Sequence, residues 1–163
     1  MIEAIIIAAG VVLDQLSKYW AETVLQTETM TVIPRILQFK QSEPNTGMAF
    51  SMMSNHTWLL TIISLVMSIV LIYMIYKYRS KIPRTMRIIL AFLTSGAIGN
   101  LIDRIVYGAV TDFIEFTFVK FATFNVADTF ITLSGIGMLC YLIFTKEGKE
   151  FFKSLDEKKE DAE

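Results

Sequence analysis

An apolar stretch from Trp58 to Tyr76 contains no charged residue. It is long enough to cross a hydrocarbon core of about 30 Å as a helix, so it predicts a membrane-spanning segment. The composition agrees, because charged residues make up 19% of the chain, against about 25% in soluble domains. The net charge of −1 gives no electrostatic reason to expect nucleic acid binding. The length of 163 residues predicts a single integral-membrane domain.

Three further stretches are candidates to cross the membrane: Ile2 to Leu25, Ile88 to Ile105 and Val126 to Phe144. The first of them is interrupted by Asp14 and Lys18. Together with the charge-free stretch, they predict an all-α membrane protein with four transmembrane helices.

The loop between the second and third candidates carries five basic residues and no acid: Lys77, Arg79, Lys81, Arg84 and Arg87. An excess of Lys and Arg is typical of cytoplasmic loops. With four crossings, both termini are then expected to be cytoplasmic. The mixed-charge tail, residues 146–163, is expected to be partly disordered.

The two remaining connections are expected to face outward. The first, about residues 26–57, has β-like runs broken by Pro34 and Pro44, so we expect short strands resting on the membrane surface. The aromatic segment 115–124 could pair with those strands or lie as an amphipathic patch at the interface.

Several polar groups are expected at the outer ends of the helices. Asp14 and Lys18 are four residues apart on one helical face, which favours an ion pair, although either side chain could also contact a neighbour or a substrate. Asn100 shares a face with Asp103 or Arg104, in a structural network or in direct contact with a substrate. Arg104 is the better contact candidate, because a guanidinium suits carbonyl and phosphate oxygens.

Asp112 follows the third candidate helix and Asp128 opens the fourth, so the topology places both acids at one depth. Asn125 could cap the fourth helix, with Asp128 in its first turn. Each acid alone could be a surface or helix-end carboxylate. Together at the membrane edge, they suggest a pair that shares a proton and activates water.

Other nucleophiles and metals are not expected. His56 is the only histidine and has no partners for a metal site, and Cys140 is expected to be buried deep in the fourth helix. No cofactor is expected either.

Five ordered blocks resemble those of the lipoprotein signal peptidases, also called signal peptidase II. The blocks are Asp14-Gln-x-Ser-Lys18, Asn45-x-Gly-x-Ala-Phe50, Gly96-x-x-Gly-Asn-x-Ile-Asp-Arg104, Val110-x-Asp-Phe113 and Phe124-Asn-x-Ala-Asp128. Each block alone is unspecific, whereas the ordered set covers nearly the whole chain and is highly specific.

The resemblance implies an aspartic endopeptidase of the bacterial cytoplasmic membrane, with an extracytoplasmic β-cradle and an outer helix or loop over a site near the outer face. Its implied substrate is a prolipoprotein with a diacylglyceryl-modified cysteine, which is cut just before that cysteine. Implied partners are membrane lipid and cyclic peptide antibiotics that mimic the substrate.

The same resemblance implies roles for individual residues. Asp112 and Asp128 match the catalytic pair. The other matching positions engage the substrate or support the site: Asn45, Gly47, Arg104, Asp14, Lys18, Asn100, Asp103 and Asn125. The chain departs from the usual pattern at Met48, Ser95 and Thr111, and Met48 could alter the pocket beside Asn45.

Two other functions remain open from the residues alone. A small transporter or proton pathway would also use intramembrane acids, but it would need them spread through the helices. A non-catalytic membrane assembly factor would explain the glycines but not the paired aspartates.

Overall fold

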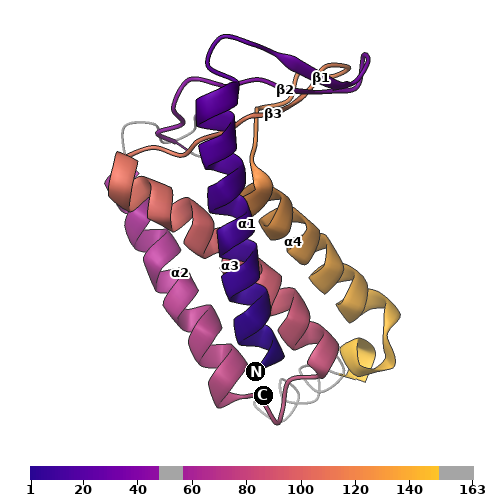
Figure 1. Ribbon diagram of the computed structural model, residues 1–163. Helices are drawn as coiled ribbons and strands as arrows, with labels where there is room; N and C mark the ends of the chain where they lie inside the picture. Colours follow the sequence, from indigo (N-terminus) through magenta and orange to yellow (C-terminus); the bar gives the residue numbers. More distant parts are fainter. Residues whose placement is uncertain (48–56, 151–163) are drawn as a thin grey trace.

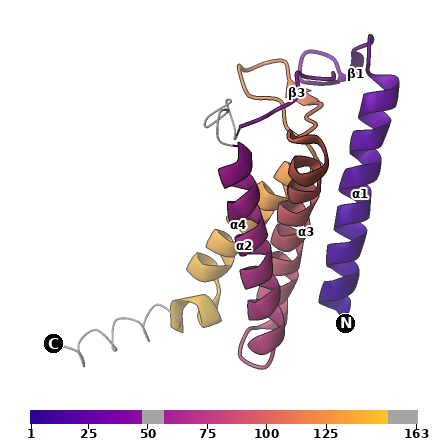
Figure 2. The ribbon, with the colours of Figure 1, turned by 90° about the vertical axis from the view of Figure 1, so that its left-hand side faces the viewer.

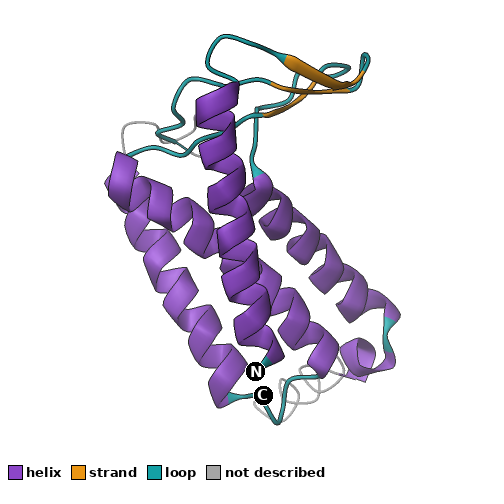
Figure 3. Ribbon diagram, viewed as in Figure 1, coloured by secondary structure: helices purple, strands orange, loops and turns teal. Residues whose placement is uncertain are grey.

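Four long helices run side by side and carry a small sheet at one end (Figures 1 and 3). The computed structural model describes residues 1–47 and 57–150. Met48, His56 and the tail beyond residue 150 therefore lie outside the described residues. The implied outer helix is not found in the described part of the first outer connection, residues 25–47.

Three helices are long and apolar enough to span a membrane: α2 (Thr57–Lys77), α3 (Arg84–Tyr107) and α4 (Val126–Phe144). They coincide with three of the four expected crossings, and by length and composition they are candidates to span a membrane. The first helix, α1 (Ile2–Val24), is equally long but is not among these three, and it carries charged residues such as Asp14 and Lys18 within its length.

The helix α3 is central, since it packs against α1, α2 and α4 (Figure 2). Two glycines on α3 allow this packing. A Cβ atom added at Gly96 would lie 2.5 Å from the Ala127 carbonyl oxygen, and one added at Gly99 would collide with the Asp14 carboxylate. The missing side chains therefore bring α1 and α4 onto one stretch of α3.

Apolar side chains cover much of the outside of the helices, as on Leu133, Ile136 and Leu139 of α4. Cys140 is exposed on the same helix, so the expectation that it is buried was wrong. In a membrane the surface of a helix bundle faces lipid, and an apolar residue loses nothing by lying there.

The sheet is antiparallel in the order β1 (Met30–Ile33), β2 (Leu37–Phe39) and β3 (Ile114–Phe116). Strands in the first outer connection are thus confirmed, and the start of the aromatic segment pairs with them. The sheet is joined to α1 by three rings packed edge to face, those of Trp20, Phe39 and Phe113.

Candidate active site

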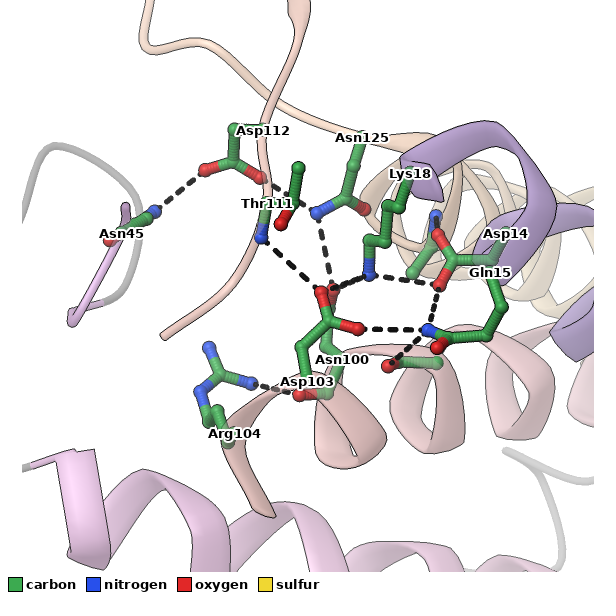
Figure 4. Close-up of polar contacts among 12 residues, drawn as sticks. Asp14, Gln15, Lys18, Asn45, Asn100, Asp103, Arg104, Thr111, Asp112 and Asn125 are labelled. Atoms are coloured by element: carbon green, nitrogen blue, oxygen red, sulfur yellow. Dashed lines mark hydrogen bonds and ion pairs between the residues drawn. The ribbon is translucent and has the colours of Figure 1, made fainter. Parts of the chain in front are cut away.

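Lys18 lies at the centre of a buried ionic group between α1 and α3. Its Nζ atom is 2.8 Å from Asp14 Oδ2 and 2.9 Å from Asp103 Oδ2, and it donates to Asn100 Oδ1 at 3.0 Å. The predicted Asp14–Lys18 ion pair therefore forms, and Lys18 also bonds a neighbouring helix (Figure 4). One cation is thus shared by two buried carboxylates.

Asp14 and its neighbour Gln15 extend this group to the other helices. Asp14 Oδ1 accepts a hydrogen bond from the Ala127 backbone N–H at 2.8 Å, which fixes the start of α4. Gln15 Nε2 donates to Asp103 Oδ1 at 2.8 Å. Residue-by-residue interpretation missed Gln15, although its place inside the Asp14–Lys18 block was a signal that it faces the same neighbour.

Asn125 caps α4, as predicted, in a capping box with Asp128. The Asp128 backbone N–H donates to Asn125 Oδ1 at 2.9 Å, and the Asn125 backbone N–H donates to Asp128 Oδ2 at 3.3 Å. Asn100 Nδ2 donates to Asp128 Oδ1 at 2.7 Å. Lys18 occupies the oxygen of Asn100, so the amide group of Asn100 presents its N–H donors to Asp128.

Asp112 is held by two amides from different parts of the chain (Figure 4). Asn45 Nδ2 donates to Asp112 Oδ2 at 2.8 Å, and Asn125 Nδ2 donates to Asp112 Oδ1 at 2.7 Å. The Gly47 backbone N–H donates to Asn45 Oδ1 at 2.9 Å and so orients that amide. Asn125 therefore connects Asp112 with the capping box that contains Asp128.

The environment of Asp112 favours its protonated form. Its side chain is 3% exposed, and this burial raises the pKa of Asp112 from 3.8 to about 6. The nearby Asp128 charge also raises the pKa, whereas the hydrogen bonds from Asn45 and Asn125 and the charge of Lys18 lower it. A carboxyl group with a pKa near 6 can both hold and release a proton at neutral pH.

Asp112 and Asp128 both line a cavity of about 630 Å³ between α2, α3 and α4. Leu60, Met67 and Leu93 are among the apolar residues of its wall. A second cavity of about 930 Å³ is lined mainly by residues 42–46 and 115–123, and Asp112 and Asn45 line both cavities. The carboxylate of Asp112 thus lies where an apolar space meets a more polar one.

Arg104 lines the apolar cavity with part of its hydrogen-bonding capacity unused. Nη2 donates to the Gly47 carbonyl oxygen at 3.3 Å and Nη1 to the Asn100 carbonyl oxygen at 3.4 Å, both long contacts. Its Nε atom is buried and has no partner among the described residues. A ligand oxygen in the cavity would satisfy this donor.

The predicted site residues thus fall into two layers. Lining the apolar cavity are Asn45, Gly47, Asn100, Arg104, Asp112 and Asp128. Asp14, Lys18 and Asp103 lie behind them, and Asn125 is completely buried between the layers. Within residues 1–47 and 57–150, no group of three or more His, Cys, Asp and Glu side chains is arranged to hold a metal ion.

Comparison with known proteins identifies the family of this site. A model of the family described as signal peptidase (SPase) II matches residues 6–145. The chain belongs to the signal peptidase II family. Members of this family are aspartic proteases that cleave signal peptides from prolipoproteins, so the predicted protease activity is confirmed and the transporter and assembly-factor alternatives are set aside.

Relatives in this family match the chain over most of its length. The lipoprotein signal peptidase of Caldanaerobacter subterraneus subsp. tengcongensis is 43% identical over 147 residues, which cover 89% of this chain and 98% of that protein. The lipoprotein signal peptidase of Clostridium novyi is 37% identical over 151 residues, covering 90% and 99%. A solved bacterial membrane enzyme, determined by the in meso method at 2.3 Å resolution, has a TM-score of 0.78 and 30% identity over 86% of this chain and 87% of that one.

Proposed function

We propose that Asp112 and Asp128 are the catalytic pair of this signal peptidase and activate a water molecule for attack on a peptide carbonyl. The observation that carries the proposal is that both carboxylates line one cavity and both accept hydrogen bonds from Asn125. Two carboxylates held close together share one proton, because both cannot remain ionised. That arrangement provides a base and an acid at one place.

The two aspartates take different roles in this proposal. Asp128 is the base, because it lies in the first turn of α4, where the helix dipole favours a negative charge. Asp112 is the acid, because burial favours its protonated form. The pair titrates as a unit, so the roles describe the reactive protonation state.

Proton transfers then accompany two bond changes. In the first step the water oxygen bonds to the carbonyl carbon, Asp128 takes a proton from the water, and Asp112 gives its proton to the carbonyl oxygen. In the second step Asp112 takes back a hydroxyl proton and Asp128 gives its proton to the amide nitrogen. The bond between carbon and nitrogen breaks, and the pair returns to its starting protonation.

Asparagine side chains hold the pair without neutralising it. Asn45 and Asn125 fix Asp112, and Asn100 fixes Asp128. Donors placed in advance in a site of low dielectric stabilise developing charge without reorganising during the reaction.

We propose that the substrate is a prolipoprotein whose cysteine carries diacylglycerol and that the cut falls just before that cysteine. The apolar cavity suits acyl chains, whose transfer into an apolar environment contributes about 0.8 kcal/mol per methylene group. The more polar cavity suits the polypeptide. Arg104, which lines the apolar cavity, can donate to a substrate oxygen there. Cyclic peptide antibiotics that mimic the substrate would compete for the same spaces.

We also propose that α1 is a fourth membrane crossing, that both termini are cytoplasmic and that the site lies near the outer face of the bacterial cytoplasmic membrane. Apolar side chains cover the exposed side of α1, such as Ile5, Val12 and Leu16, whereas Asp14 and Lys18 face the bundle. The basic loop lies at the end of the bundle opposite the sheet, which fits a cytoplasmic position for that end.

Purified protein can be tested with two precursor peptides that differ only in the diacylglyceryl group, with mass spectrometry to locate the cut. We expect cleavage directly before the modified cysteine and none of the unmodified peptide. Equal cleavage of both peptides, or a cut elsewhere, would contradict the proposed substrate.

A further inference from the structure

Asp112 lies on an extended segment, and Thr111, the residue before it, makes two hydrogen bonds to neighbouring helices. The hydroxyl group of Thr111 donates to Glu22 Oε1 at 2.6 Å, and the backbone N–H of Thr111 donates to Asp103 Oδ2 at 3.2 Å. Glu22 belongs to α1 and Asp103 to α3, so the segment is tied to both helices. Neither Thr111 nor Glu22 lines either of the two cavities.

Phe113, the residue after Asp112, is held in place by apolar contacts and by a backbone hydrogen bond. Phe113 is 3% exposed and packs against the rings of Trp20 and Phe39. The Lys40 backbone N–H donates to the Phe113 carbonyl oxygen at 2.9 Å. Successive side chains of an extended segment point to opposite sides, so residues 111 and 113 face α1 while Asp112 faces the cavities.

We infer that Thr111 is a positioning residue of the protease and that its hydrogen bond to Glu22 sets the place of the Asp112 carboxylate relative to Asp128. This role rests on the proposed function of Asp112. A hydroxyl donating to a carboxylate makes a short, charge-assisted bond, which is stronger than a bond between neutral groups. This bond is the only one that joins the Thr111 side chain to α1 among the described residues.

The expected effect is on the rate of the chemical step rather than on substrate binding. A displacement of about 1 Å at a reacting group can cost about 100-fold in rate. The Asp103 bond and the Phe113 contacts remain when the hydroxyl is removed, so we expect a smaller loss of about tenfold in kcat, with KM unchanged.

The experiment compares Thr111→Val, Glu22→Leu and their combination with the wild type, using the lipid-modified peptide at saturating and subsaturating concentrations. Valine keeps the branched shape of threonine and removes only the donor. Thr111→Ser keeps the hydroxyl group and is expected to restore kcat. Thr23→Val is the matched control, because the Thr23 hydroxyl is exposed and bonds only to carbonyl groups of its own helix.

Three results together support the role. Thr111→Val and Glu22→Leu each lose about tenfold in kcat, and their combination loses no more than either. Thr111→Ser stays within about twofold of wild type. Thermal unfolding of each variant separates this result from a loss of folded protein. Wild-type kcat in both Thr111→Val and Glu22→Leu would overturn the inference, as would losses that multiply in the double variant. Should Thr111→Val fail to fold, Glu22→Leu and Thr111→Ser decide the question. Wild-type activity of Asp112→Asn would instead overturn the proposed function itself.

Discussion

Both ends of the helix bundle contain buried carboxylates, but the groups that contact these carboxylates differ. At the end opposite the sheet, the Glu3 carboxylate is 2.8 Å from Arg87 Nε, 3.3 Å from the N-terminal nitrogen and 4.0 Å from Arg79 Nη2. This acid is surrounded by cations. At the sheet end, Asp112 and Asp128 have no cation within 4.0 Å among the residues that the structure describes.

Asparagine amides take the place of cations around the two aspartates. A cation within ion-pair distance strongly favours the ionised carboxylate, so a group such as Glu3 keeps its charge and serves structure. An amide orients a carboxylate with a weaker preference for the charged form. Glu3 and Asp112 are both buried, so burial alone does not decide whether a carboxylate can exchange a proton: cations pair with Glu3, whereas amides bond Asp112.

The largest effect is expected from Asp112→Asn and Asp128→Asn. Each substitution removes one of the two proton-transfer groups, so cleavage of the lipid-modified peptide should fall by at least about 10³-fold. Peptide cleavage measured by mass spectrometry checks this, with Glu28→Gln, an exposed acid, as the control. Activity within tenfold of wild type in either variant would refute the pair.

Asp112→Asn, which should abolish most of the activity, is not expected to lower the stability of the folded protein. Its pKa is raised from 3.8 to about 6, so the folded protein keeps a proton that the unfolded chain releases between these pH values. The contribution of Asp112 to stability therefore falls as the pH rises through this range and is least favourable above pH 6. Thermal unfolding at neutral pH should show Asp112→Asn to be at least as stable as wild type.

The next largest effect on kcat is expected from a substitution that disturbs helix packing at the sheet end. In Gly99→Ala the new methyl group would meet the Asp14 carboxylate and lie 3.3 Å from the Ala127 Cβ atom, which displaces α1 and α4 from α3. We expect a loss of about tenfold in kcat and a lower unfolding temperature. In the control Gly135→Ala, where a Cβ atom meets nothing within 4 Å, the better helix propensity should leave both quantities equal or improved.

A substitution at the end of the bundle opposite the sheet should lower stability without changing kcat. Glu3→Gln weakens the contacts that tie the start of α1 to Arg87, and we expect the unfolding temperature to fall by roughly 5 °C while the folded protein keeps wild-type kcat. Thermal unfolding and peptide cleavage on one preparation measure both. A lower kcat without a lower unfolding temperature would erase the distinction between the two ends.

The smallest effect concerns the pH dependence of kcat/KM. Loss of the Asp112 proton should lower kcat/KM above pH about 6. Asn45 lowers this pKa, as do Asn125 and Lys18, whereas Asp128 raises it. Asn45→Ala should therefore move the decline to a higher pH. In the described part of the chain, the hydroxyl group of Ser42 donates only to backbone carbonyl groups, so Ser42→Ala should leave the pH of the decline in kcat/KM unchanged.

Sequence patterns predicted the helices well where apolar residues run without charge. The fourth candidate coincides with α4, and the second differs from α2 by one residue at each end. Asn125 was predicted as a cap because capping is a local pattern that depends on residues three positions apart. The strands of the first outer connection followed from its β-branched runs and its prolines.

Contacts between helices could not be predicted from sequence patterns in the same way. The bond from Gln15 to Asp103 depends on which faces of α1 and α3 meet, and no spacing within one helix determines that. Cys140 was wrongly predicted to be buried, because burial rules for soluble proteins do not apply to a surface that faces lipid. The link through Asn125 joins residues from a loop and a helix, and only the fold brings them together.

Infrared difference spectra of wild type and Asp112→Asn, recorded from below to above pH 6, observe the shared proton directly. We expect the wild type to show one protonated carboxyl group that ionises at pH about 6 and is missing from the variant. A wild-type spectrum in which both aspartates stay ionised below that pH would show that the amides do not hold a proton-sharing pair.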